Sequence, residues 1–172
     1  AGPSSLPTPP GVDRVDVVTA EDMREAITEK FPHASMVFMA AAVADFRVPN
    51  QAAEKIKKGP GGLTLELERT VDILGEIAAQ RDEQLLVGFA AETESVLANA
   101  QRKLREKGID LIVANDVAGS DTGFGVDTNA VTIFNRKGGR EIVPLMSKDA
   151  IADRILDAAV EFQRQRESGD LV

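Results

Sequence analysis

The sequence predicts an α/β protein, a Rossmann-like three-layer α/β/α sandwich with a mainly parallel sheet and an antiparallel strand extension. Three runs, at 36–45, 85–92 and 110–117, are apolar along most of their length, as parallel strands covered on both faces are. Helical patterns separate these runs, and strands that alternate with helices are typical of a parallel sheet. Two further stretches, at 63–67 and 130–145, alternate apolar and polar residues in the manner of antiparallel strands.

The first half of the chain contains five expected elements. They are a short strand at 14–18, a helix at 20–31, the buried strand at 36–45, a polar segment rich in glycine and lysine at 46–62, and the amphipathic strand at 63–67. The helix begins after Thr19, whose hydroxyl is a good N-cap, and Pro32 ends it.

The second half alternates helices and strands before it closes with a hairpin. Its expected elements are a helix at 71–81 capped by Thr70, the strand at 85–92, a helix near 94–107 ended by Gly108, the strand at 110–117, a loop at 118–129, hairpin strands at 130–134 and 140–145, and a helix from the cap Ser147 to about Arg166. A length of 172 residues fits one domain, so a single domain with an appended arm is expected over 1–172.

The composition excludes several kinds of chemistry. The chain has no Cys, Tyr or Trp and a single His, which excludes thiol nucleophiles, cysteine metal clusters and Tyr–Lys hydride chemistry within it. His33 lies between a helix and a strand, at the end opposite the expected ligand crevice, and is predicted to be structural or exposed. A formal net charge of −8 argues against binding to nucleic acid through a broad basic surface. No apolar run is long enough to span a membrane, and the opening residues do not resemble a signal peptide.

The three buried strands end in small residues followed by polar ones. Their last residues read AAAVAD, GFAAE and ANDV. Ligands of an open parallel sheet bind beyond the carboxyl ends of its strands, and Ala or Gly there lets a ligand approach the backbone closely. The alternative is that these small residues make room for helices that pack on the sheet. Three such strands together favour a binding site.

Two groups of lysines are candidate anion ligands. Lys55, Lys57 and Lys58 precede a Gly-Pro-Gly-Gly segment, which suits a flap that closes over a polyanion, although a solvated basic loop has the same composition. Lys103 and Lys107 are four residues apart on one helix face, where like charges repel unless an anion lies between them. A plain solvated face is the alternative for this pair.

The turn into the helix at 71–81 and the loop at 118–129 are further candidates. Free N–H groups at residues 71–74 form an anion site at a helix amino terminus, where Asp72 is either a favourable charge or a metal ligand. The loop with Phe124 between two glycines is either a lid or an ordinary connection. The sequence contains neither GxGxxG nor GxxxxGK[ST], so a standard dinucleotide or P-loop site lacks its motif.

Six motifs in one order resemble phosphopantothenoylcysteine synthetase, the CTP-dependent ligase half of the bacterial bifunctional coenzyme A biosynthesis flavoprotein. They are AAAVADF, EKIKK, TVDIL, VGFAAET, KGIDLIVANDV and GFGVDTNAVTIF, within a resemblance that runs from about Gly2 to about Leu156. The resemblance implies a cytoplasmic enzyme that joins 4′-phosphopantothenate to L-cysteine. CTP would activate the carboxylate as an acyl-cytidylate with release of pyrophosphate, and the cysteine amine would then displace CMP.

The resemblance also implies the site. The positions that match CTP contacts of the family are Met39, Ala40, Ala41, Asp45, Lys55, Val71, Asp72, Ile73, Leu74, Phe89, Lys103 and Lys107. Lys55 is the residue expected to take part in catalysis. Mg²⁺ is expected with the triphosphate, without assigned ligands, and FMN only in the decarboxylase half.

The family further implies a homodimer and a fused decarboxylase domain. The antiparallel arm would pair the subunits, with residues 63–70 and 130–137 as the expected segments. The family begins with a further strand–helix unit, which carries a GGT-type turn and a catalytic Asn, and that unit is expected to precede this chain. Two other functions remain open from the residues alone: a Rossmann-type NAD(P)-binding reductase, and a nucleotide-sensing or oligomerising domain without enzymatic activity.

Overall fold

The computed structural model describes residues 1–50, 52–57, 61–92, 96–116 and 126–169. Contacts between Cα atoms divide the chain into two compact units. Unit 1 comprises residues 1–30 and 41–73, and unit 2 comprises residues 31–40 and 74–172. The single domain expected over 1–172 stays a prediction.

Unit 2 contains a five-stranded sheet in the order β1-β4-β5-β6-β7. Its strands are β1 Met36–Met39, β4 Leu85–Glu92, β5 Leu111–Asp116, β6 Thr128–Asn135 and β7 Arg140–Ser147. β1, β4 and β5 are parallel, and β6 and β7 continue the sheet as an antiparallel hairpin. The predicted α/β sheet with an antiparallel extension is therefore confirmed.

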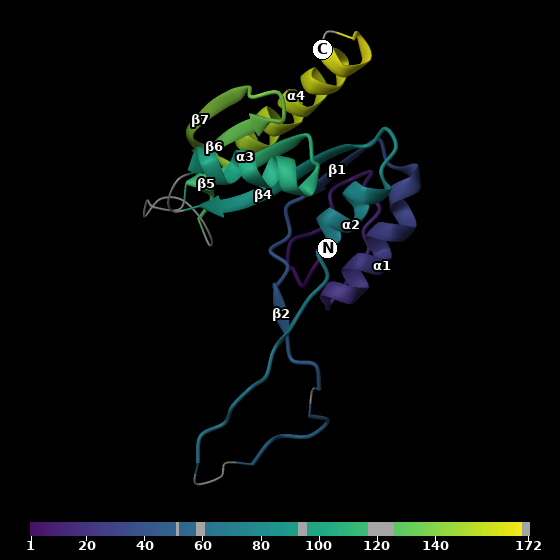
Figure 1. Ribbon diagram of the computed structural model, residues 1–172, viewed down its shortest axis with the longest axis vertical. Helices are drawn as coiled ribbons and strands as arrows, with labels where there is room; N and C mark the ends of the chain where they lie inside the picture. Colours follow the sequence, from purple (N-terminus) through teal and green to yellow (C-terminus); the bar gives the residue numbers. More distant parts are fainter. Residues whose placement is uncertain (51, 58–60, 93–95, 117–125, 170–172) are drawn as a thin grey trace. The chain divides into compact units, whose positions relative to one another are not determined.

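Helices cover both faces of this sheet (Figure 1). They are α2 Ile73–Gln80, whose first residue belongs to unit 1, α3 Val96–Lys107 and α4 Lys148–Glu167, while the 3-10 turn η1 Phe31–His33 precedes β1 in the chain. Leu85 and Val87 join the apolar side chains of α4 in one core cluster, whereas the intervening Leu86 points to the other face, where α3 lies. The cluster on the α4 face consists of Leu85, Val87, Leu111, Val113, Val131, Ile133, Val143, Ile151, Ile155, Ala159 and Phe162.

The helix ends of unit 2 follow the local signals. The Ser147 hydroxyl accepts the Ala150 N–H at 3.2 Å, which confirms Ser147 as the N-cap of α4. Gly108 has a φ of +62° and follows the last residue of α3, as expected for a helix that a left-handed glycine ends. His33 is exposed, as predicted.

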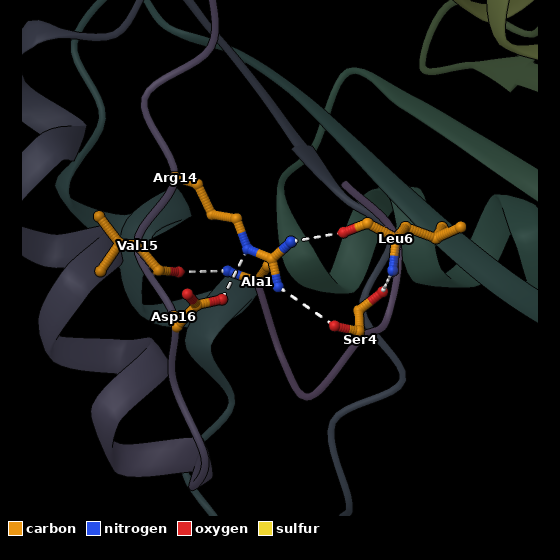
Figure 2. A network of polar contacts seen from close by, with 6 residues as sticks. All are labelled: Ala1, Ser4, Leu6, Arg14, Val15 and Asp16. Carbon is orange, nitrogen blue, oxygen red and sulfur yellow. Dashed lines mark hydrogen bonds and ion pairs between the residues drawn. The ribbon is translucent and has the colours of Figure 1, made fainter. Parts of the chain in front are cut away.

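Unit 1 begins with an irregular segment that ends at the helix α1, Ala20–Lys30. The predicted strand at 14–18 is wrong, because within the described ranges only Ala1 exchanges backbone hydrogen bonds with it. The guanidinium of Arg14 instead holds the opening residues together. It bonds to Asp16 Oδ1 at 2.6 Å and to the carbonyl oxygens of Leu6 at 2.8 Å and Ser4 at 3.4 Å (Figure 2).

Thr19 caps α1 as predicted. Its hydroxyl accepts the Asp22 N–H at 3.1 Å, and Asp22 Oδ2 in turn accepts the N–H groups of Thr19 at 2.9 Å and Val18 at 3.1 Å. The Thr19 N–H bond is the main reason that the pKa of Asp22 lies below its ordinary 3.8, since it stabilises the carboxylate.

The remainder of unit 1 is an arm that leaves a two-stranded pair. β2 Phe46–Arg47 and β3 Glu68–Arg69 are antiparallel, and the described residues between them form a long irregular loop (Figure 1). The predicted strand at 63–67 is wrong: no described strand pairs with it, and its three leucines, Leu63, Leu65 and Leu67, are 56–68% exposed. It therefore adds nothing to the main sheet.

One other expectation requires correction. The buried strand expected at 36–45 stops at Met39, because the ladder with β4 ends at Gly88 and the backbone of 40–44 leaves the sheet. The segment 130–137, expected to pair subunits, lies mostly in β6, which pairs with β5 and β7, and its place in a subunit interface stays a prediction. The loop expected at 118–129, either a lid or an ordinary connection, falls largely outside the described residues. No helix in the described part of the chain has the length and apolar character required to cross a bilayer.

Candidate functional site

The carboxyl ends of β4 and β5 present small buried residues side by side. Ala90 pairs with Ala114, and both are almost completely buried. Gly88 has a packing role: a Cβ on it would lie 2.8 Å from Ile109 Cδ1 and 3.0 Å from Leu74 Cδ2. The close packing of Ile109 and Leu74 is therefore sufficient to explain why a glycine occupies position 88.

The predicted residues of unit 2 lie on different faces of the sheet. Met39 ends β1 and is half-buried, and Ala40 follows it and is exposed. Phe89 is half-buried against the cluster that α4 covers. Lys103 and Lys107 belong to α3, which covers the other face, so the structure does not bring them to Phe89.

The two lysines also lie toward the amino ends of the strands. Only residues 108–110 separate Lys107 from β5, and Lys103 is one helical turn, about 6 Å, nearer the carboxyl ends. Both side chains are half-buried, and neither is without a partner in the chain. The two lysines therefore lie away from the carboxyl ends of the strands, and their contact with a nucleotide stays a prediction.

In unit 1, the structure brings together two of the predicted segments. The Thr70 N–H donates to the Asp45 carbonyl oxygen at 2.9 Å, and the Thr70 hydroxyl donates to the Ala44 carbonyl oxygen. Thr70 was expected to cap the following helix, but α2 begins only at Ile73, and the Thr70 hydroxyl is used across the chain instead. These two hydrogen bonds thus hold Asp45 close to Thr70, the residue that directly precedes Val71.

A cavity of about 1140 Å³ lies beside these bonds, within unit 1. Of the predicted residues, Ala41 and Val71 line it. Its other walls come from the opening residues, the start of α1, the segment around β2, and Arg69 and Thr70. The cavity is large enough for a small organic ligand.

Asp72 is exposed and directly precedes α2, so it lies at the amino end of that helix as expected. It has an interaction within the chain. Asp45 is exposed as well. Because no group of three metal-ligating side chains gathers among the described residues, a protein-built metal cage is not present there.

Lys55 lies on the arm of unit 1 and is exposed, as is Lys57. Within the described ranges, Lys55 forms no ion pair, so its ammonium group is available to an anion. Lys58 and the residues after it, up to Pro60, lie outside the described residues. The flap itself stays a prediction.

One charged group that the sequence did not mark is buried at the opposite end of the strands. Asp110 is fully buried and accepts Arg81 Nη1 at 2.6 Å and the Leu86 N–H at 2.9 Å, with Arg136 Nη1 at 3.3 Å. These contacts join the amino ends of β4 and β5 and the β6–β7 turn, and they give Asp110 a structural role. Its position inside an apolar run concealed it in the sequence.

Comparison with known proteins places these features in a family. The family model of the DNA/pantothenate metabolism flavoprotein C-terminal domain matches residues 1–162. The chain belongs to this family. The match includes every candidate residue described above.

Relatives of this flavoprotein C-terminal domain include bifunctional enzymes. It is 46% identical over 166 residues to the coenzyme A biosynthesis bifunctional protein CoaBC of Bacillus subtilis, covering 96% of this chain and 41% of that protein. It is 41% identical over 164 residues to CoaBC of Escherichia coli K12, covering 93% of this chain and 40% of that protein. The chain thus spans about two-fifths of the length of these relatives.

The fold also matches a solved structure. The crystal structure of the C-terminal domain of CoaBC superposes with a TM-score of 0.79 at 38% identity, covering 95% of this chain and 74% of that chain. The α/β fold of the family is therefore the fold of this chain.

Proposed function

We propose that this chain is the ligase part of a coenzyme A biosynthesis enzyme, which joins 4′-phosphopantothenate to L-cysteine with CTP. The observation that carries the proposal is the 46% identity to the CoaBC protein of Bacillus subtilis over 96% of this chain. The six motifs of the resemblance lie within the part of the chain that the family model matches.

The proposed reaction has two steps. The phosphopantothenate carboxylate attacks the α-phosphorus of CTP, which forms a mixed anhydride and releases pyrophosphate. The cysteine amine then attacks the anhydride carbonyl, loses a proton, and expels CMP to leave the amide. Since the anhydride is sensitive to water, the site has to exclude solvent between the two steps.

Residues of unit 1 receive the central roles in this proposal. The backbone of Ala41 and of Val71–Ile73 would lie along the nucleotide, where N–H groups at the start of α2 favour a phosphate. Asp45 would accept hydrogen bonds from the ribose or the base. Lys55 would approach the phosphates from the arm as a point charge, and its exposed ammonium group, which forms no ion pair among the described residues, supports that role.

Unit 2 contains further residues that we propose to contact the nucleotide. They are Met39, Ala40, Leu74 and Phe89. Lys103 and Lys107 would neutralise phosphate charge only for a nucleotide that reaches the α3 face of the sheet, because that is the face on which they lie.

Mg²⁺ would supply charge neutralisation for the leaving pyrophosphate. The donor set is compatible with an ion carried by the triphosphate, since Mg²⁺ is commonly held by substrate phosphates and one or two carboxylates. Asp45 and Asp72 are the exposed carboxylates of unit 1 within the proposed site.

A homodimer through the arm belongs to the same proposal. The exposed leucines Leu63, Leu65 and Leu67, with Phe46 and Ile56, are apolar side chains that a second subunit would cover. A fused flavin decarboxylase domain is proposed from the bifunctional relatives, whose length exceeds that of this chain.

The decisive test measures pyrophosphate release from CTP. It uses this chain and a chimaera in which the chain replaces the matching residues of the Bacillus subtilis relative. Pyrophosphate should appear only when 4′-phosphopantothenate is present, and CMP and the amide should follow when cysteine is added. A melting temperature that rises with NADPH and not with CTP, without pyrophosphate release, would instead support a reductase.

A further inference from the structure

Thr70 joins two chain segments that carry proposed nucleotide contacts. Its N–H donates to the Asp45 carbonyl oxygen at 2.9 Å, and its hydroxyl donates to the neighbouring Ala44 carbonyl oxygen. Val71 follows Thr70 directly. Thr70 therefore connects the backbone of Ala44 and Asp45 to the backbone that leads into α2.

The same residue closes the base of the arm. The two β2–β3 pairs are Arg47 with Glu68 and Phe46 with Arg69, and the Thr70–Asp45 bond follows them as the next connection. Arg47 Nε lies 2.7 Å from Glu68 Oε1, and the Arg69 guanidinium carbon lies 6.0 Å from the Phe46 ring centroid.

The contacts at the base of the arm are exposed, and the hydrogen bond of the Thr70 hydroxyl is one of them. All four β2 and β3 side chains are exposed, so their ion pair is weakened by solvent. Thr70 is half-buried and lines the cavity of unit 1 together with Ala44 and Val71. Thr70 is thus less exposed than the four residues that pair in β2 and β3 at the base of the arm on which Lys55 lies.

We propose that the Thr70 hydroxyl is a positioning residue for the nucleotide. By bonding to Ala44 it holds the Asp45 backbone and residues 71–73 at a set separation, and it aligns the base of the arm that carries Lys55. Thr70 touches no reacting atom in this proposal, which rests on the proposed CTP-dependent ligase function.

The test compares Thr70→Val with Thr70→Ser in the chimaera described above. Valine has the shape of threonine without the hydroxyl, and serine keeps the hydroxyl. We expect the KM for CTP to rise about tenfold in Thr70→Val, the size of effect that one hydrogen bond supplies. The KM for L-cysteine should remain unchanged, and Thr70→Ser should lie within about twofold of the unsubstituted protein in its KM for CTP.

The control is Thr132→Val, a half-buried threonine of β6 in unit 2, which should leave both KM values unchanged. A lower melting temperature for Thr70→Val with an unchanged KM for CTP would make Thr70 merely structural and overturn the proposal. An equal defect in Thr70→Ser would overturn it as well, because the hydroxyl would not be responsible. Absence of pyrophosphate release in the unsubstituted chimaera would overturn the proposed function, and this inference with it.

Discussion

β4 and the arm both contain leucine-rich stretches, but the leucines of β4 are buried and those of the arm are exposed. In β4 of unit 2, Leu85 and Leu86 are completely buried between two helical layers. In the arm of unit 1, Leu63, Leu65 and Leu67 are more than half exposed. A strand-like pattern of apolar residues therefore predicts burial only where another part of the chain supplies a partner.

The two regions also differ in their expected contributions, because β4 contributes to stability and the arm to the proposed function. The β4 stretch supplies side chains to the core of unit 2, whereas the arm supplies Lys55, an exposed cation that packs against little. Substitutions in β4 should consequently change the free energy of unfolding, and those in the arm should change activity.

The largest expected difference is between two leucines. Leu85→Ala should lower the free energy of unfolding by about 2–5 kcal/mol, because it leaves a cavity in the core. Leu65→Ala should change it by less than about 0.5 kcal/mol, since this side chain is exposed. Urea denaturation at low protein concentration measures both. A comparable loss for Leu65→Ala would show that the single chain buries the arm.

The second difference concerns activity and rests on the proposed function. Lys55→Gln should lower kcat about a hundredfold, the size of effect expected when a charge-stabilising donor is removed. Its free energy of unfolding should change by less than about 0.5 kcal/mol, because the side chain is exposed. Lys57→Gln, two residues away on the same arm, is the matched control for pyrophosphate release. An unchanged rate in Lys55→Gln would remove Lys55 from the site.

The smallest difference is between two glycines. Gly88→Val should destabilise unit 2 by about 1–3 kcal/mol, because the new side chain would press on Ile109 and Leu74. Gly61→Val should cost less than about 0.5 kcal/mol, since no atom lies within 4 Å of a Cβ there. Thermal unfolding compares the pair. Equal melting temperatures would mean that the small residue in β4 serves something other than packing.

Local signals in the sequence predicted much of this protein correctly. Thr19 and Ser147 cap helices, Gly108 ends one, and the β4 run is a strand over the predicted residues. These features depend on groups within a few residues of each other, so the order of amino acids is sufficient to specify them. The six family motifs are local in the same sense.

Contacts between residues far apart in the chain determined the features that local sequence patterns did not predict. Thr70 looks like a helix cap, yet its hydroxyl bonds to Ala44, 26 positions earlier in the chain. Lys103 and Lys107 have the spacing of an anion site, but the path of α3 carries them away from Phe89.

The order of residues was therefore enough to specify the helix ends at Thr19, Gly108 and Ser147, the extent of β4, and the family to which the chain belongs. Only the folded chain showed which leucines are covered, which hydroxyl links distant backbone segments, and on which face each lysine lies. Burial and cross-chain hydrogen bonds require a second group from elsewhere in the chain, and folding alone brings that group into contact.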